Sequence, residues 1–184
     1  MNRKEIFSDQ EEEIKSLYFK ILDLKQKLDS TFSIELNRSL PFADVLFDRW
    51  ERARVMGFGK GTSVYDSCHI FGNVKIGENT WIGPFTILDG SGGLKIGANC
   101  SISSGVQIYS HDSVDWAISG GKEPYTYEET TIGENCYVGS NTIISKGVEI
   151  GEGCVIGANS LVKNSFPAGS KIGGTPAKII NSLR

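Results

Sequence analysis

Branched aliphatic residues recur every six positions along most of the chain. The series runs from Val64 to Leu88, resumes two residues out of step at Ile96, and returns after a break at Ile132. The next position is often Gly, the fourth is rich in Asn and Gly, and the fifth is small or β-branched. An α-helix would need apolar spacings of three and four, so the period indicates a different structure. Six residues make one short strand and one turn, and three such units make a coil of about 18 residues.

The repeat predicts an all-β solenoid of stacked coils over residues 58–170. The branched first residue of each unit suits a pleated, inward-facing position, and Asn or Gly tolerates the left-handed backbone of a tight corner. The period does not give the handedness of the coil. The fifth position predicts small, reduced core thiols without a catalytic or metal role, and it holds Cys68, Cys100, Cys136 and Cys154.

The two ends of the chain depart from the repeat. Residues 1–57 predict a helical segment, and residues 171–184 a C-terminal tail. Residues 9–29 predict an amphipathic helix, which either packs on a solenoid or forms a short coiled coil; its heptad seam is Ile14, Leu17, Ile21, Leu24 and Leu28. A second helix is expected to start near Pro41 and to end at Gly57 to Gly61, burying Phe42, Val45, Leu46, Trp50 and Ala53.

Composition excludes several classes of protein. The net charge of −3 comes without a basic block, so no nucleic-acid partner is expected. The N-terminal run MNRKEIFSDQEEE is too polar for a signal peptide, and no apolar run approaches the roughly 20 residues of a membrane span. We therefore expect a cytoplasmic protein without a transmembrane segment. The 22 Gly against 5 Pro favour many tight turns over disorder.

The candidate chemistry lies where the repeat breaks. Of the two histidines, His69 is expected on the solvated surface. His111 occupies a fourth position, where other units carry Asn or Gly, and an excursion over residues 112–131 follows it directly. A long departure from a regular solenoid is usually functional or disordered, so His111 is either a ligand-facing group or a corner residue.

The segment ISSGVQIYSHD, and TIGENCYVGSNTIISKGVEIGEGCVIGANSLVKNSFPAGSKIGGTPAKII after the excursion, resemble the hexapeptide-repeat acetyltransferases. Similar members are the galactoside and maltose, xenobiotic and lipopolysaccharide O-acetyltransferases. The resemblance covers roughly residues 57–180 and implies a left-handed parallel β-helix. It further implies a homotrimer with active sites between subunits and acetyl-CoA as donor. The family's catalytic histidine corresponds to His111, as general base.

The resemblance also implies contacts for the donor. Ser140 in YVGSN and Ala158 in VIGAN, 18 residues apart, match positions that line the pantetheine arm; alternatively both are ordinary corner residues. Lys163-Asn164 stands where the family often has Thr-Lys, and Lys178 in TPAKII matches a basic residue near the coenzyme phosphates. A solvated lysine is the alternative for Lys178.

The acceptor side has weaker matches. Asp89, in the irregular LDGSGGLK, either binds sugar hydroxyls or caps the turn. Trp116, Tyr125 and Tyr127 in the excursion either stack on a pyranose ring or pack on the adjacent subunit, and packing is favoured for the tyrosines. Asp112 and Asp115 are candidates for orienting the imidazole of His111, although turning the chain is the favoured role for Asp112.

The sequence therefore predicts an acetyl-CoA-dependent O-acetyltransferase acting on a hydroxyl of a sugar or glycan precursor. One alternative is N-acetylation of a nucleotide-linked amino sugar, and another is a non-catalytic scaffold. A zinc carbonic anhydrase needs three histidine ligands, which two histidines cannot supply, so no metal is expected.

Overall fold

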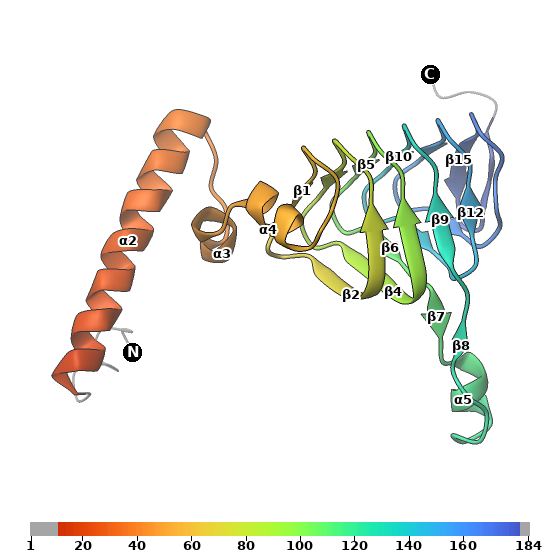
Figure 1. Ribbon diagram of the computed structural model, residues 1–184, viewed down its shortest axis with the longest axis horizontal. Helices are drawn as coiled ribbons and strands as arrows, with labels where there is room; N and C mark the ends of the chain where they lie inside the picture. The colour runs from red at the N-terminus through yellow and green to blue at the C-terminus, as the bar shows by residue number, and fades with distance from the viewer. Residues whose placement is uncertain (1–10, 181–184) are drawn as a thin grey trace. The chain divides into compact units, whose positions relative to one another are not determined.

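The computed structural model describes residues 11–180 and divides between Phe47 and Asp48 into two units. The larger unit is a parallel β-solenoid whose six coils are stacked side by side in Figure 1. Ser63 pairs with Trp81, 18 residues later, and Tyr137 pairs with Val155 at the same interval. This spacing confirms the predicted coil of three six-residue units.

One sheet runs the length of the solenoid along a single face. Its parallel strands, in spatial order, are β1 (Ser63–Val64), β3 (Trp81–Ile82), β5 (Ser101–Ile102), β10 (Tyr137–Val138), β13 (Val155–Ile156) and β15 (Lys171–Gly174). Strand β16 (Ala177–Ile179) closes this sheet antiparallel to β15. Residues 171–179, predicted as a tail, are therefore part of the solenoid, and residues 181–184 lie outside the described residues.

A second sheet covers the other two sides, because two of its strands bend around a corner. These are β2 (His69–Ile76) and β4 (Ile87–Ile96). The first half of β4 pairs with β6 and its second half with β9. The remaining strands are β6 (Gln107–Ile108), β9 (Thr130–Ile132), β11 (Ile143–Ile144), β12 (Glu149–Ile150) and β14 (Leu161–Val162).

The corners have the backbone that the Asn and Gly pattern predicts. Positive φ angles occur at Asn79, Asn99, Asn135, Asn141 and Asn159. Asn73 is an exception, because Gly72 takes the left-handed conformation there. His111 has no positive φ and lies in a strand, whereas Phe85, a bulky residue, has a φ of 59°. Such a residue in the left-handed region costs about 1–2 kcal/mol, because its Cβ approaches the following carbonyl oxygen.

The core is a narrow column of aliphatic side chains, one per unit, as the six-residue period predicts. Ile82, Ile102, Ile144 and Ile156 have no exposed surface. The fifth positions fill the space beside them, and all four cysteines are buried and unbridged. The prediction of inward-facing, reduced thiols is confirmed.

A short helix covers the N-terminal end of the solenoid. Helix α4 (Arg49–Val55) packs against β1, and its N-cap Asp48 accepts hydrogen bonds from two backbone N–H groups. Arg52 donates to the carbonyl oxygens of Tyr65 and Cys68, which belong to the first coil and have no coil before them to pair with. The solenoid unit therefore begins at residue 48, ten residues before the predicted boundary.

The predicted second helix is broken in two. Helix α3 (Phe42–Leu46) ends before Asp48, which starts α4. Val45 and Ala53 are buried as expected, whereas Leu46 and Trp50 are 41% and 49% exposed. The expected single buried stripe is wrong, because its two halves lie on separate helices in separate units.

The smaller unit consists of α2 (Glu12–Leu36) and α3, which packs against it. The predicted helix start at residues 9–10 lies outside the described residues. No α2 residue is buried, and within this unit the seam residues Ile14, Leu17, Ile21 and Leu24 are between 42% and 58% exposed. Whether this seam packs on a solenoid or on a second helix stays a prediction.

The excursion is an antiparallel hairpin with a helix at its tip. Strands β7 (His111–Asp112) and β8 (Thr126–Tyr127) pair at its root, and α5 (Val114–Ile118) follows β7. In Figure 1 it projects away from the stacked coils. Ser101 pairs with Tyr137, 36 residues later, so the excursion adds one coil's length of chain without adding a coil.

Two glycines at the same position of neighbouring coils test how closely the coils pack. A Cβ added at Gly139 would lie 2.5 Å from the Ala158 nitrogen, whereas one at Gly157 would have its nearest neighbour at 3.5 Å. We expect Gly139→Ala to lower the free energy of unfolding by about 1–3 kcal/mol, because the next coil must move. Gly157→Ala should change it by less than about 0.5 kcal/mol. Urea unfolding measures both, and equal effects would contradict the proposed coil contact.

Candidate active site

The root of the excursion places His111 at a corner of the solenoid. Its side chain is 32% exposed, and its Nδ1 lies 2.5 Å from Oδ2 of Asp89. Asp89 ends the first half of β4, one coil before His111, and its side chain is 2% exposed. A partly exposed imidazole is therefore held from behind by a buried carboxylate.

The irregular segment after Asp89 explains how this carboxylate is held. Oδ1 of Asp89 accepts a hydrogen bond from the Ser91 N–H at 2.9 Å, and Oδ2 accepts one from the Ser110 N–H at 3.1 Å. The Ser110 hydroxyl donates to the Asp89 carbonyl oxygen and accepts from the Gly92 N–H. Gly92 must lack a side chain, because a Cβ there would lie 2.3 Å from the Ser110 carbonyl oxygen. This coil has two residues more than the regular 18, and they allow the chain to fold around the carboxylate of Asp89.

Asp89 is ionised because its hydrogen bonds outweigh its burial. Burial disfavours the charged form, but the hydrogen bonds from Ser91, His111 and Ser110 together lower the pKa of Asp89 to about 2. An ionised carboxylate only accepts hydrogen bonds, so Nδ1 of His111 carries the proton. In the neutral imidazole, the other nitrogen, Nε2, then has a free lone pair.

The structure distinguishes between the alternatives left open for Asp89, Asp112 and Asp115. Of the two alternatives for Asp89, the hydrogen bond from the Ser91 N–H agrees with a turn cap, and the buried carboxylate faces His111. The chain-turning role favoured for Asp112 agrees with the structure, because its carboxylate accepts hydrogen bonds from the Val114 N–H and the Thr126 hydroxyl. Asp115 lines a separate pocket beside Ile118 and Glu123.

The root hairpin presents two different faces. On one face the ring of His111 stacks against Tyr127 and Tyr125, with centroids 5.9 and 6.3 Å apart, and Trp116 meets Tyr125 edge-on. The tyrosines therefore contact His111 of their own chain, and each is still at least 40% exposed. Trp116 lies beyond them on α5, where it is 44% exposed.

The other face of the hairpin is held by charge. Lys146 lies 2.6 Å from Glu128 and 3.6 Å from Asp112, which stand on either side of the excursion. The hydrogen bond from Lys146 to Glu128 raises the pKa of this lysine, against the opposing effect of burial. These contacts tie both ends of the hairpin to the next coil and thereby fix the backbone that carries His111.

A pocket of about 640 Å³ opens beside His111. Tyr109, Ser145 and Lys163 line it from three successive coils, and Asp112, Ser113, Val114 and Lys146 line it from the hairpin and the adjacent corner. Lys163 is exposed, and no carboxylate of residues 11–180 lies within ion-pair distance of it. Its ammonium group is therefore available to an anionic ligand in the same pocket as His111.

The other predicted donor contacts lie elsewhere on the chain. Ser140 and Ala158 stack at a different corner, where the Asn159 N–H donates to the Ser140 carbonyl oxygen at 2.9 Å. Asn164 is exposed next to Lys163, and Lys178 is exposed on β16. One chain therefore brings His111 and Lys163 together, but leaves Ser140, Ala158 and Lys178 outside that pocket.

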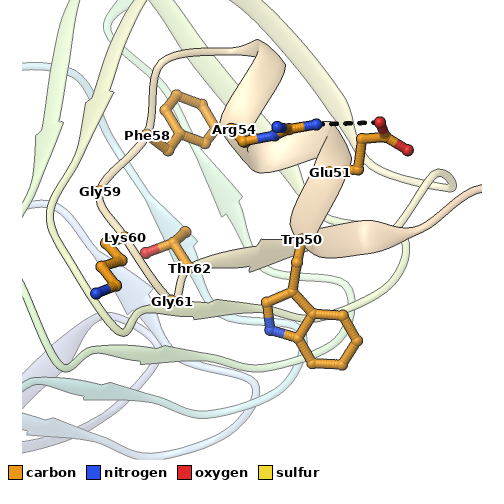
Figure 2. A pocket seen from close by; sticks show the side chains of 8 residues that line it. All are labelled: Trp50, Glu51, Arg54, Phe58, Gly59, Lys60, Gly61 and Thr62. Carbon is orange, nitrogen blue, oxygen red and sulfur yellow. Dashed lines mark hydrogen bonds and ion pairs between the residues drawn. The ribbon is translucent and has the colours of Figure 1, made fainter.

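A second pocket, of about 600 Å³, lies at the N-terminal end of the solenoid. Figure 2 shows Arg54 paired with Glu51 on α4 and Lys60 across the pocket from them. Trp50, Phe58 and Thr62 complete much of its lining. It holds none of the residues predicted for the site and no histidine, so the pocket beside His111 is the candidate active site.

Three further observations concern the predicted absences and His69. Among residues 11–180 no group of three His, Cys, Asp or Glu side chains is placed to hold a metal ion. Within the same range, no helix combines the length and the hydropathy needed to cross a bilayer. His69 is exposed on β2, as expected.

Comparisons with known proteins match both halves of the solenoid. Residues 129–164 match the model of the bacterial transferase hexapeptide, and residues 73–110 match the hexapeptide repeat of succinyl-transferase. Protein CapG of Staphylococcus aureus is 46% identical over 92 residues, which are 49% of this chain and 53% of that protein. The matched part thus spans about half the length of this curated relative.

Solved structures share the fold over most of the chain. The hexapeptide-repeat acetyltransferase VCA0836 of Vibrio cholerae, solved with acetyl coenzyme A, is 26% identical with a TM-score of 0.66, and covers 95% of this chain and 91% of its own. Galactoside acetyltransferase with coenzyme A is 24% identical with a TM-score of 0.65, covering 96% and 86%. AntD of Bacillus cereus, an N-acyltransferase solved with dTDP-4-amino-4,6-dideoxyglucose and coenzyme A, is 22% identical with a TM-score of 0.61, covering 73% and 88%. At this identity the last two likenesses show the fold alone, which is a left-handed β-helix.

The carboxylate of Asp89 should make stability depend on pH. Its folded pKa lies below the ordinary 3.8, so its contribution is complete above about pH 4 and is lost as the pH falls towards 2. We expect Asp89→Asn to unfold more easily than the wild type at pH 7, by roughly 2 kcal/mol. This difference should shrink by pH 3 and nearly vanish by pH 2. Thermal unfolding of both proteins across this range measures it, and a gap independent of pH would contradict the ionised pair.

Proposed function

Because the chain belongs to the hexapeptide-repeat transferases and shares the fold of their acetyltransferases, we propose that it moves an acetyl group from acetyl-CoA to a sugar hydroxyl. The acceptor in this proposal is a hydroxyl of a sugar or glycan precursor. The observation that carries the proposal is the pairing of partly exposed His111 with buried, ionised Asp89 beside a pocket. This pairing supplies a positioned base, which a purely structural solenoid does not need.

His111 is the general base of the proposed reaction. Its Nε2 accepts the proton of the acceptor hydroxyl while that oxygen bonds to the acetyl carbon. The bond from this carbon to sulfur then breaks, and the imidazolium returns the proton to the sulfur, so the thiol of CoA leaves and His111 is neutral again. Asp89 is a positioning residue: it keeps the proton on Nδ1 and stabilises the imidazolium between the two transfers.

The donor is proposed to lie along the coils towards the C-terminal end of the solenoid. Acetyl-CoA supplies an activated thioester and carries phosphates at its far end. Lys163 is exposed and lines the pocket of His111, so it is placed for a phosphate or a carbonyl oxygen of the donor. Ser140 and Ala158 are small residues stacked at one corner of adjacent coils, and we propose that the pantetheine arm lies along them. Asn164 and Lys178 are proposed as further polar contacts.

The site is proposed to be shared between subunits of a homotrimer. On one chain Ser140 and Ala158 lie outside the pocket of His111, so the proposed donor and base contacts do not converge there. The excursion also leaves Val114, Trp116 and Ile118 between 44% and 80% exposed. A neighbouring solenoid packed against the excursion would bury these side chains and bring its own Ser140 edge towards His111. Closed symmetry is the rule for homo-oligomers.

N-acylation of a nucleotide-linked amino sugar is the second candidate. AntD shares the fold and is solved with such a sugar, and an amine could use the same base and donor. We propose a screen of UDP-N-acetylglucosamine, UDP-galactose, simple galactosides and dTDP-4-amino-4,6-dideoxyglucose, with mass detection of each product. An ester product is cleaved by mild alkali and an amide is not, so the same samples distinguish the two reactions. Absence of thiol release with every acceptor would favour a non-catalytic scaffold.

Replacing the base tests the mechanism. We expect His111→Ala to lower kcat by about two to four orders of magnitude, because the acceptor proton then has no positioned base. Donor affinity and the melting temperature should stay close to wild type, because His111 is partly exposed and lies off the core. Thiol release from acetyl-CoA measures turnover, and calorimetry measures donor binding. Turnover like that of the wild type would overturn the assignment.

Mixing two inactive proteins tests the shared site. We combine His111→Ala chains with chains blocked in the donor groove by Ala158→Trp, after unfolding and joint refolding. If base and donor contacts come from different subunits, mixed trimers regain a measurable part of the wild-type rate, while each variant refolded alone does not. Sedimentation equilibrium should give three chains per particle. A fully active monomer would exclude the shared site.

A further inference from the structure

Phe85 is a strained and exposed aromatic residue. Its φ of 59° is a conformation that the solenoid otherwise assigns to Asn or Gly, and its side chain is 63% exposed. No aromatic ring within residues 11–180 packs against it. Both the strained backbone and the exposed ring make phenylalanine unfavourable for stability at this corner. Strained residues of this kind concentrate at functional sites.

Phe85 shares its corner with the proposed donor edge. The Gly105 N–H donates to the Pro84 carbonyl oxygen, and the same bond repeats from Asn141 to Ser104 and from Asn159 to Ser140. These bonds stack Phe85, Gly105, Asn141 and Asn159 in one column, with Ser140 and Ala158 immediately before its last two members. The column is therefore continuous from the donor edge down to Phe85.

The proposed donor contacts, His111 and Phe85 lie at successive heights along the solenoid axis. Neighbouring coils lie about 4.8 Å apart. His111 follows β6, so it belongs to the same coil as Gly105. Ser140 and Ala158 lie one and two coils towards the C-terminal end, and Phe85 lies one coil towards the N-terminal end. In a closed ring of copies whose solenoid axes are parallel, the same residue lies at the same height along the axis in every copy.

We propose that Phe85 is a specificity-determining residue that stacks against the sugar ring of the acceptor; this rests on the proposed function and its shared site. With the donor arm along Ala158 and Ser140, the acetyl group is transferred at the height of the neighbour's His111. The donor arm then fills the space on the C-terminal side of this height, so the acceptor reaches the acetyl carbon from the space left open on the N-terminal side, where Phe85 lies. An aromatic face next to the reacting hydroxyl binds the apolar face of a pyranose while leaving its hydroxyls free.

Two variants at this position separate a ligand contact from a structural role. Phe85→Asn restores the residue that other corners use, so we expect the melting temperature to rise by about 2–5 °C as the strain is relieved. The same change should raise the acceptor KM roughly three- to tenfold, because the ring contact is lost. Phe85→Tyr keeps both the ring and the strain, so it should keep the wild-type KM and melting temperature.

The measurements use the full chain with acetyl-CoA and two probes, UDP-N-acetylglucosamine and p-nitrophenyl β-D-galactopyranoside. Thiol release gives kcat and the acceptor KM, calorimetry gives the dissociation constant of CoA, and sedimentation gives the assembly state. Phe71→Asn is the matched control, because Phe71 is 51% exposed, lies on the neighbouring strand β2 and has an ordinary backbone. We expect kcat, CoA binding and assembly to be unchanged in Phe85→Asn, and every constant to be unchanged in Phe71→Asn.

The outcomes distinguish this proposal from the proposed function. An unchanged acceptor KM in an active Phe85→Asn protein overturns the contact and leaves the acetyltransferase intact. Dissociation of the assembly in Phe85→Asn also overturns it, because the ring would then serve an interface between copies. A wild-type protein that acetylates neither probe, and binds neither in the presence of CoA, overturns the acceptor contact, whereas loss of the proposed function requires failure of the whole acceptor screen.

Discussion

The structure depends on backbone hydrogen bonds between coils that stack at the spacing of a parallel sheet. The Trp81 N–H bonds to the Cys100 carbonyl oxygen, and equivalent bonds link successive coils along the solenoid. At some units this spacing leaves no room for a Cβ after the inward aliphatic residue, as at Gly139. It also limits each corner to residues that accept a positive φ. Glycines and asparagines at fixed places in the repeat follow from one geometric condition.

The pair of His111 and Asp89 forms where the regular stacking of the coils is interrupted. Two extra residues after Asp89 break the register of one coil, and the chain uses them to surround the carboxylate with hydrogen bonds. The next coil then loses its own regularity at His111, where the excursion leaves the solenoid. The two irregularities meet because they occur near the same corner of adjacent coils. The two local irregularities bring the carboxylate and the imidazole together, and the tyrosine rings and Lys146 hold the hairpin that carries His111.

Phe85 departs from the rule that corner residues are those that readily accept a positive φ, and it does so at a different corner from His111. The position holds Asn or Gly in other coils, so an exposed phenylalanine lowers the stability of the free chain, and no ring contact among residues 11–180 compensates for it. Such a residue is consistent with selection for binding instead of folding. The proposed donor edge, the base and this ring lie at successive heights along the solenoid. In the proposed site, the coil spacing therefore sets the distance between the donor and the acceptor.

The sequence by itself determined the solenoid, its coil length, its inward aliphatic column, its buried cysteines and the place of His111 at the root of the excursion. Each of these depends on residues a few positions apart, and a six-residue period records them directly. Only the tertiary structure decided that Asp89, not Asp112 or Asp115, orients His111, because the pair is 22 residues apart and meets through a register shift. The same holds for the break between α3 and α4 and for the strands after residue 170. Those features depend on which coil end is left open to be covered, a property of the stack that no single repeat contains.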